Sequence, residues 1–286
     1  MKARLSIALV MALAVALLAA LPVMAITKNY KKDSDHPFVG LVVFYDDQGE
    51  FSHRCSGSLI DPTTLVTAGH CTDDENGGVM PTARVYFQQD AGAHYDTATE
   101  LDPVSGYPET CAAGTLGTEC ATSGEMYDYG FDGFAGFPNI HDAGLVILDQ
   151  AITLPEYGVL PSAGTLNNVI KNRNTTVRFR MSGYGLSYAS PVRAVSLRER
   201  LMADGKLVNL KSANNAGFNL QTQGNGKGKG GTCSGDSGGP VFYPRTTNKI
   251  VAVTSFGMNA NCRGVDFAYR LDQAAVLRWI DGIINP

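Results

Sequence analysis

The chain has 286 residues, of which 44% are hydrophobic and 17% charged, so it can bury a substantial core and does not have a disordered composition. The formal net charge is −4 and no sustained Lys/Arg run occurs, since the Lys-Gly-Lys at 227–229 is too short for a nucleic-acid groove. Thirty-two glycines and short apolar runs between turn residues favour β structure.

Residues 1–25 have the pattern of a cleaved secretory signal. Lys2 and Arg4 give a positive start, an apolar run extends from 5 to 21, and Ala25 offers a small residue for cleavage. The alternative is a membrane anchor, because the run approaches the roughly 17 residues that a span needs. We expect cleavage, which removes two positive charges and takes the net charge from −4 to −6. The mature protein would be secreted or otherwise extracytoplasmic, without a stable membrane anchor.

Strand-like runs follow along the rest of the chain, separated by turn signals such as Asp61-Pro62. They are residues 39–45, 58–60, 64–67, 84–87, 145–148, 176–182, 197–202, 217–220, 240–243, 250–254 and 267–271. Residues 155–168 have the character of a connection between domains, 224–231 that of a flexible glycine loop, and 271–284 that of an amphipathic helix.

The segment 90–140 is long, rich in glycine and irregular. A loop of this length inside a compact domain indicates a function or a covalent staple. Because Cys111 and Cys120 lie within it, we expect a local disulfide. The loop is then either a passive stapled segment or one that screens substrates or binds a partner.

Six cysteines all lie after the signal, and an even number in an exported chain predicts three disulfides. Composition alone leaves 15 pairings open. No two cysteines have the C-x-x-C spacing, so the pattern gives little support to a zinc or redox site.

Three residues occur in contexts that suit nucleophilic catalysis. A serine hydroxyl attacks only when a base removes its proton, and that base is usually a histidine oriented by a carboxylate. His70 comes just after a predicted strand, Asp142 just before one, and glycines surround Ser237. Asp128 and Asp132 are alternative carboxylates, but neither leads directly into an apolar strand.

The segments Thr-Ala-Gly-His-Cys at 67–71 and Gly-Asp-Ser-Gly-Gly-Pro at 235–240 resemble the two signature motifs of the trypsin/chymotrypsin family. The order His70, Asp142, Ser237 is also that of the family, whereas α/β-hydrolases and subtilisins follow other orders. The resemblance extends from Ile26 to the C-terminal helix.

This resemblance implies an all-β fold of two antiparallel six-stranded β-barrels with a C-terminal helix. Residues 26–155 would form the first barrel, with His70 and Asp142, and residues 156–286 the second, with Ser237. The N–H groups of Gly235 and Ser237 would form the oxyanion hole. The resemblance also implies the pairs Cys55–Cys71 and Cys233–Cys262, which leaves Cys111 with Cys120.

Activation in the family depends on a freed N-terminal Ile or Val whose ammonium pairs with the aspartate before the catalytic serine. The resemblance assigns these roles to Ile26, which signal cleavage would expose, and Asp236. Residues 27–29, Thr-Lys-Asn, depart from the usual Val-Gly-Gly. His53 resembles a family histidine that holds the same aspartate in inactive forms.

The resemblance places the floor of the specificity pocket at Gly231, where trypsins carry aspartate. The remaining pocket residues would be Thr232, Ser255, Phe256, Gly257 and, on an ambiguous spacing, Asp266. A buried cation needs a partner, so a floor without a carboxylate disfavours Arg and Lys. We expect cleavage after apolar or small uncharged residues, unless the Asp266 side chain points into the pocket.

The predicted function is therefore a serine endopeptidase that acts on protein or peptide substrates without a cofactor or metal. Calcium is an alternative at residues 73–76, Asp-Asp-Glu-Asn, although acidic surface runs are usually only solvated. The rival function is a non-catalytic binding protein on the same fold. The sequence gives no prediction of the oligomeric state.

Overall fold

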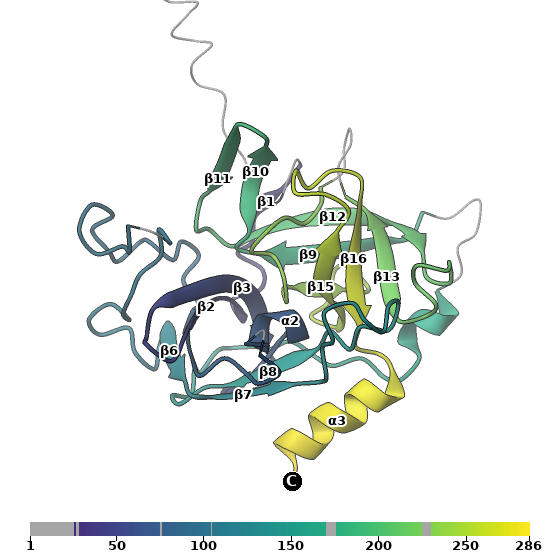
Figure 1. Ribbon diagram of the computed structural model, residues 1–286, viewed down its shortest axis with the longest axis horizontal. Helices are drawn as coiled ribbons and strands as arrows, with labels where there is room; N and C mark the ends of the chain where they lie inside the picture. Colours follow the sequence, from purple (N-terminus) through teal and green to yellow (C-terminus); the bar gives the residue numbers. More distant parts are fainter. Residues whose placement is uncertain (1–25, 27–28, 75, 104, 170–175, 225–229) are drawn as a thin grey trace, which may run out of the picture.

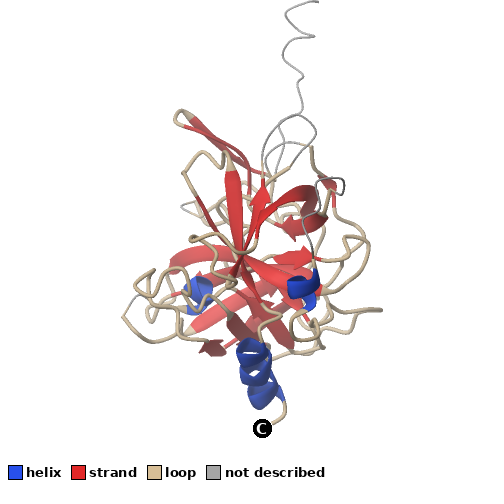
Figure 2. Ribbon diagram, turned by 90° about the vertical axis from the view of Figure 1, so that its right-hand side faces the viewer, coloured by secondary structure: helices blue, strands red, loops and turns tan. Residues whose placement is uncertain are grey.

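The computed structural model describes residues 26, 29–74, 76–103, 105–169, 176–224 and 230–286. The predicted signal at 1–25 lies outside the described residues. Strands dominate and gather into two sheets, with a helix at the C-terminus (Figure 1, Figure 2). This confirms the predicted all-β class with two barrels and a C-terminal helix.

The first sheet contains seven antiparallel strands in the order β6-β5-β2-β3-β4-β8-β7. Its strands are β2 (Val39–Tyr45), β3 (Phe51–Leu59), β4 (Thr64–Thr67), β5 (Thr82–Tyr86), β6 (Cys120–Ser123), β7 (Glu125–Asp128) and β8 (Gly144–Ile147). Every residue of β2 is buried, which fits its continuous apolar sequence. The sheet curls into a nearly closed barrel around this strand and its neighbours.

The second sheet has the order β1-β12-β13-β16-β15-β14-β9, and the pairing of β12 with β9 closes six of its strands into a barrel. Its strands are β1 (Lys31–Lys32), β9 (Arg178–Gly183), β12 (Leu201–Asn209), β13 (Asn219–Gln223), β14 (Pro240–Phe242), β15 (Ile250–Gly257) and β16 (Val265–Arg270). A separate hairpin of β10 (Leu186–Ser190) and β11 (Arg193–Ser196) projects from it.

Helical structure in the described residues is confined to α2 (Gly69–Thr72), η1 (Thr165–Asn168) and α3 (Ala274–Ile284). The buried residues of α3, Val276 and Ile280, join the larger core cluster, which contains most of the buried first-barrel residues and a few from β14, β15 and β16. Trp279 packs against Tyr129, just beyond β7, with ring centroids 5.2 Å apart. Among the described residues, no helix has the length and apolarity that a membrane crossing demands.

The first and last elements of the described chain contact different barrels. Strand β1 pairs with β12 of the second barrel, whereas α3 contacts the first through Trp279 and Tyr129. The division into 26–155 and 156–286 stays a prediction, and these two elements cross it.

Residues 87–119 form a long excursion between β5 and β6. The disulfide Cys111–Cys120 closes its final ring, at a sequence separation of 9. The excursion also touches the second barrel's loops, because the hydroxyls of Tyr107 and Ser196 lie 2.9 Å apart and Arg198 donates to the Gly106 carbonyl at 2.8 Å. These contacts tie the excursion to the hairpin β10–β11.

Candidate active site

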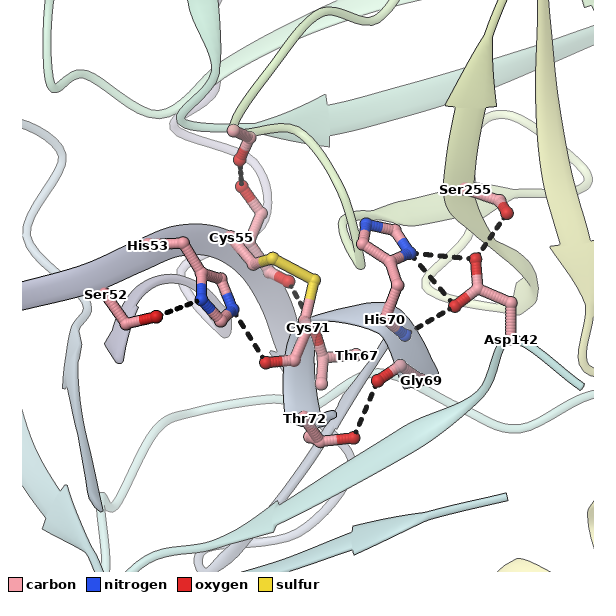
Figure 3. Close-up of a disulfide and its surroundings, with 12 residues drawn as sticks. Ser52, His53, Cys55, Thr67, Gly69, His70, Cys71, Thr72, Asp142 and Ser255 are labelled. Carbon is pink, nitrogen blue, oxygen red and sulfur yellow. Dashed lines mark hydrogen bonds and ion pairs between the residues drawn. A yellow bond between two sulfur atoms is a disulfide. The ribbon is translucent and has the colours of Figure 1, made fainter. Parts of the chain in front are cut away.

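The first barrel brings His70 and Asp142 together (Figure 3). His70 lies in α2, directly after β4, and Asp142 lies just before β8, which pairs with β4. The His70 Nδ1 is 3.0 Å from each Asp142 carboxylate oxygen, and the His70 backbone N–H donates to Asp142 Oδ1 at 2.8 Å. The Ser255 hydroxyl of β15 donates to Asp142 Oδ2. The carboxylate thus fixes the histidine and links the two barrels.

Electrostatics within the pair favour a negative Asp142 and a basic His70. Burial alone raises the pKa of Asp142, but the charge of His70 and the hydrogen bonds from His70 and Ser255 hold it below its ordinary value. Burial lowers the pKa of His70, yet the Asp142 charge and hydrogen bond, with smaller contributions from Asp128 and Asp73, raise it overall. The His70 side chain keeps 26% of its surface exposed, so the rest of the ring can reach a substrate.

Ser237 lies in the loop between β13 and β14, next to the segment that leads to His70. Its carbonyl accepts from the Ser56 N–H at 2.7 Å, and Ser237 itself is half-buried. A side chain at Gly238 would collide with Thr67 and Ala68, so glycine is required for this close approach. Within the described chain no hydrogen bond joins the Ser237 hydroxyl to His70, a contact that often tightens only with substrate bound.

The loop before Ser237 presents two backbone donors with no partner. In the described part of the chain the N–H groups of Gly235 and Ser237 make no hydrogen bond, although those of Asp236 and Gly238 do. Gly235 has φ of +94°, a conformation that side-chain-bearing residues rarely adopt. Unpaired N–H groups beside a nucleophile are the arrangement that stabilises an oxyanion.

Asp236 points into the protein and is fully buried. Its Oδ1 accepts from the Gly185 N–H at 2.8 Å and its Oδ2 from the Cys233 N–H at 2.9 Å. Burial raises the pKa of Asp236 to about 7, against these hydrogen bonds and the charge of Arg54. The carboxyl group therefore lies inside the protein without an ion-pair partner among the described residues.

Ile26 is also fully buried, packed with Leu201 and Ala203 of β12. Its adjacent residues are outside the described chain, and its pairing with Asp236 stays a prediction. His53 is engaged on the first barrel, where its Nε2 lies 2.9 Å from the Cys71 carbonyl oxygen (Figure 3).

A pocket of about 280 Å³ opens beside Ser237. Of the predicted residues it is lined by Thr232, Ser255, Phe256 and Gly257, and the disulfide Cys233–Cys262 braces its wall. Gly231 and Asp266 do not line it.

Asp266 lies directly behind the pocket wall. Its Oδ2 accepts from the Thr232 N–H at 3.1 Å, and the space around it requires glycine at 224 and 231. Burial raises the pKa of Asp266 to about 7.

Sequence reasoning missed an aromatic wall beside the histidine. Phe134 and Phe137 make edge contacts with Phe256, and the Phe131 ring centroid lies 5.8 Å from that of His70. The signal was present in the three-residue spacing of phenylalanines at 131, 134 and 137 within the irregular segment. Phe134 and Phe137 are 45% and 43% exposed, so both rings are open to solvent beside Phe256, which lines the pocket.

The remaining cysteines form Cys55–Cys71 beside His70. Cys55, Cys71 and His70 are the one group of three potential metal-binding side chains in the described residues. Because both sulfur atoms are joined in the disulfide, neither cysteine has a free thiolate to bind a metal ion. At the calcium alternative, Asp74 Oδ1 accepts from the N–H groups of Asn76 and Gly78, while residue 75 lies outside the described chain. Calcium binding stays untested.

Sequence relatives of the chain are proteases. The family described as Trypsin matches residues 28–110 and 141–280. CLIP domain-containing serine protease B10 of Anopheles gambiae is 26% identical over 88% of this chain and 67% of its own length. Serine protease 7 of Drosophila melanogaster is 27% identical over 87% of this chain, which spans only 62% of that relative. Chymotrypsin-like elastase family member 1 of Felis catus is 25% identical over 84% of this chain and 82% of its own.

Solved structures share the fold at lower identity. HL collagenase is 18% identical with a TM-score of 0.58, over 87% of this chain and 94% of its own. Human heparin binding protein is 20% identical with a TM-score of 0.57, and the match covers 90% of this chain and 97% of that protein's chain. The scabies mite inactivated protease paralogue S-D1 is 16% identical with a TM-score of 0.57, and the match covers 91% of this chain and 96% of that protein's chain.

The family match covers more than half of the chain and includes the segments around both motifs. The relatives that align with most of the chain are named serine proteases and elastases. The chain belongs to the trypsin family of serine endopeptidases.

Proposed function

We propose that this protein is a secreted endopeptidase in which Ser237 is the nucleophile, His70 the general base and Asp142 its orienting carboxylate. The observation that carries the proposal is the His70–Asp142 pair beside two unpartnered N–H groups, those of Gly235 and Ser237. Three disulfides support an exported protein, and residues 1–25 would supply the signal.

The reaction begins when Ser237 Oγ attacks the peptide carbonyl carbon and the His70 Nε2 accepts its proton. The negative oxygen of the tetrahedral intermediate receives hydrogen bonds from the Gly235 and Ser237 N–H groups. Collapse breaks the C–N bond, and His70 returns the proton to the leaving amine. Water then attacks the acyl-enzyme by the same route, releasing the acid and regenerating Ser237. Asp142 keeps the His70 Nδ1 protonated and stabilises the imidazolium.

The second candidate is a binding protein without catalysis. It is favoured by the fold alone, since one structural neighbour is named a heparin binding protein and another an inactivated protease. The residues of the site argue against it, because His70, Asp142 and Ser237 are all present and the first two are hydrogen-bonded.

A fluorophosphonate probe separates the two functions. We expect covalent labelling of the mature protein at Ser237, because only a serine with an activated hydroxyl attacks the phosphorus. The measurement is mass spectrometry of the labelled peptide, with Ser237→Ala as the unlabelled control and Ser234→Ala, an exposed neighbour, as the labelled one. A folded protein that resists the probe would support the binding protein.

For specificity, we propose cleavage after apolar or small uncharged residues. Asp266 supports this, because burial raises its pKa to about 7 and it lies behind Thr232 instead of lining the pocket. At neutral pH much of the carboxyl group is uncharged, so an Arg or Lys in the pocket lacks a full counter-charge.

The preference should therefore depend on pH. Between about pH 6 and pH 8 the kcat/KM for an Arg peptide relative to a Leu peptide rises by up to about tenfold, following the ionised fraction of a carboxyl group with pKa near 7. The ratio cancels the titration of His70, which acts on both substrates. Asp266→Asn should make the ratio independent of pH. A flat ratio in the unaltered protein would contradict a role for Asp266.

A further inference from the structure

A cationic side chain borders the loop that carries the Gly235 and Ser237 N–H groups, here called the oxyanion loop, without lining the specificity pocket. Arg54 lies in β3, two residues before Ser56 and so on the same strand face. Ser56 holds the loop through its N–H to the Ser237 carbonyl, at 2.7 Å, and its hydroxyl to the Gly235 carbonyl, at 2.8 Å. The Arg54 Nε would lie 3.2 Å from a Cβ placed on Gly235, so the guanidinium lies directly against this loop.

The Arg54 guanidinium is held in place but lacks an anionic partner. Its central carbon lies 4.8 Å from the ring centroid of Tyr107, a cation–π contact with a residue that is 2% exposed. Its Nε is buried without a hydrogen-bond partner, and no described carboxylate forms an ion pair with it. The charge of Arg54 acts to lower the pKa of Asp236, but both carboxylate oxygens of Asp236 already accept hydrogen bonds from backbone N–H groups. Arg54 itself is half-buried, so part of its side chain is open to a ligand.

The position of Arg54 assigns it to one side of the scissile bond. The pocket that would hold the residue before that bond is lined by Ser255 and Phe256. Arg54 lies against Gly235, and neither it nor Tyr107 is among the residues that line that pocket. Because Arg54 borders this loop but not the pocket, a peptide that fills the pocket would reach it only beyond the scissile bond.

We propose that Arg54 is a specificity residue that binds a carboxylate on the leaving-group side of the scissile bond, within the first two residues after it. This rests on the proposed peptidase function. A planar guanidinium binds carboxylates through paired, charge-assisted hydrogen bonds, and the cation–π contact with Tyr107 holds this one in position. The carboxylate is either an acidic side chain or the C-terminus of a peptide that ends two residues after the bond.

Matched peptides test the proposal. Peptides with Glu or Gln at the first or second position after the bond are compared, together with a pair that ends at the second position as a free acid or an amide. We expect kcat/KM to favour the carboxylate member of at least one pair by about fivefold at low salt, the size of a partly exposed ion pair. The preference should decrease as ionic strength rises.

Variants then assign the preference to Arg54. In Arg54→Gln the ratio of kcat/KM values within the favoured pair should fall to about one. In Arg54→Lys the ratio should be partly retained, since lysine keeps the positive charge but lacks the paired donors of the guanidinium. Arg84→Gln is the matched control: Arg84 lies 4.4 Å from the ring centroid of Tyr45 in the same barrel, away from the loop, and the change should preserve the ratio. Far-UV circular dichroism checks that each variant is folded.

Each outcome is decisive. Ratios near one in the unaltered protein overturn the inference while leaving the peptidase function intact, because the uncharged peptides are still cleaved. An equal loss in Arg84→Gln overturns it as well, since general charge would then explain the preference. An intact mature protein that cleaves neither member of any pair contradicts the proposed function and the inference with it.

Discussion

Asp142→Asn is expected to lower kcat by about 10⁴-fold, the size seen when a triad carboxylate becomes an amide. Asp142 accepts from the His70 ring, the His70 N–H and the Ser255 hydroxyl. An amide nitrogen facing His70 Nδ1 must donate, which forces the ring proton onto Nε2. A histidine in that tautomer cannot accept the proton of Ser237, so the nucleophile stays inactive.

The pH profile distinguishes this effect from a loss of structure. In the unaltered protein kcat/KM should rise with pH as His70 loses its proton, with a midpoint above the ordinary histidine value because Asp142 raises the pKa of His70. Removing the negative charge should move the midpoint of the residual activity to lower pH. Ser255→Ala, which removes one donor but keeps the carboxylate, should cost far less. Equal losses in both variants would contradict the assigned roles.

A mature chain that begins at Ile26 should be active, and one extra residue before Ile26 should lower kcat/KM by about 100-fold or more, as expected for a buried charge left without its partner. Burial raises the pKa of Asp236 to about 7, so an ammonium group beside it would strongly stabilise the charged carboxylate. A blocked terminus cannot supply that group, and the loop carrying the Gly235 and Ser237 donors then loses its anchor. N-terminal sequencing of active protein, with kinetics of both chains, provides the measurement.

Asp236→Asn in the chain that begins at Ile26 should reproduce the loss, because an amide cannot pair with the ammonium. Activity of the Ile26 chain should also fall at alkaline pH as the terminal amine, with an ordinary pKa of about 8, loses its proton. Full activity in the extended chain would contradict the pairing of Ile26 with Asp236, whereas an active terminus other than Ile26 would show that secretion alone does not generate the active form.

The strands could be predicted where local sequence determines burial. Residues 39–45 match β2 at both ends because all seven are buried, whichever face of the sheet they occupy. The predicted helix 271–284 begins three residues earlier than α3. Residues 217–220 were expected as a strand, whereas β13 runs over Asn219–Gln223. Its register depends on β12 and β16, whose pairing is not encoded in a short window.

The site could be predicted to the extent that its chemistry is local in sequence. Glycines around Ser237 and a histidine beside a cysteine are visible along the chain. The position of Asp266 behind Thr232 is not, because the strand spacing near 264–267 allowed either face. The contact of Arg54 with Gly235 spans distant parts of the chain, and only the folded arrangement reveals it.

The contacts of β1 and α3 determine how the two barrels can separate during unfolding. Strand β1 precedes the first barrel in sequence but pairs with the second, and α3 follows the second barrel but contacts the first. Each of these two contacts, here called a clasp, therefore connects the two halves. A single cut in the connection at 155–168 would leave both clasps closed, so the halves would stay together. Separation requires both β1 and α3 to detach, so we expect the two barrels to unfold together and the Ser237 loop to stay beside the segment that leads to His70 until then.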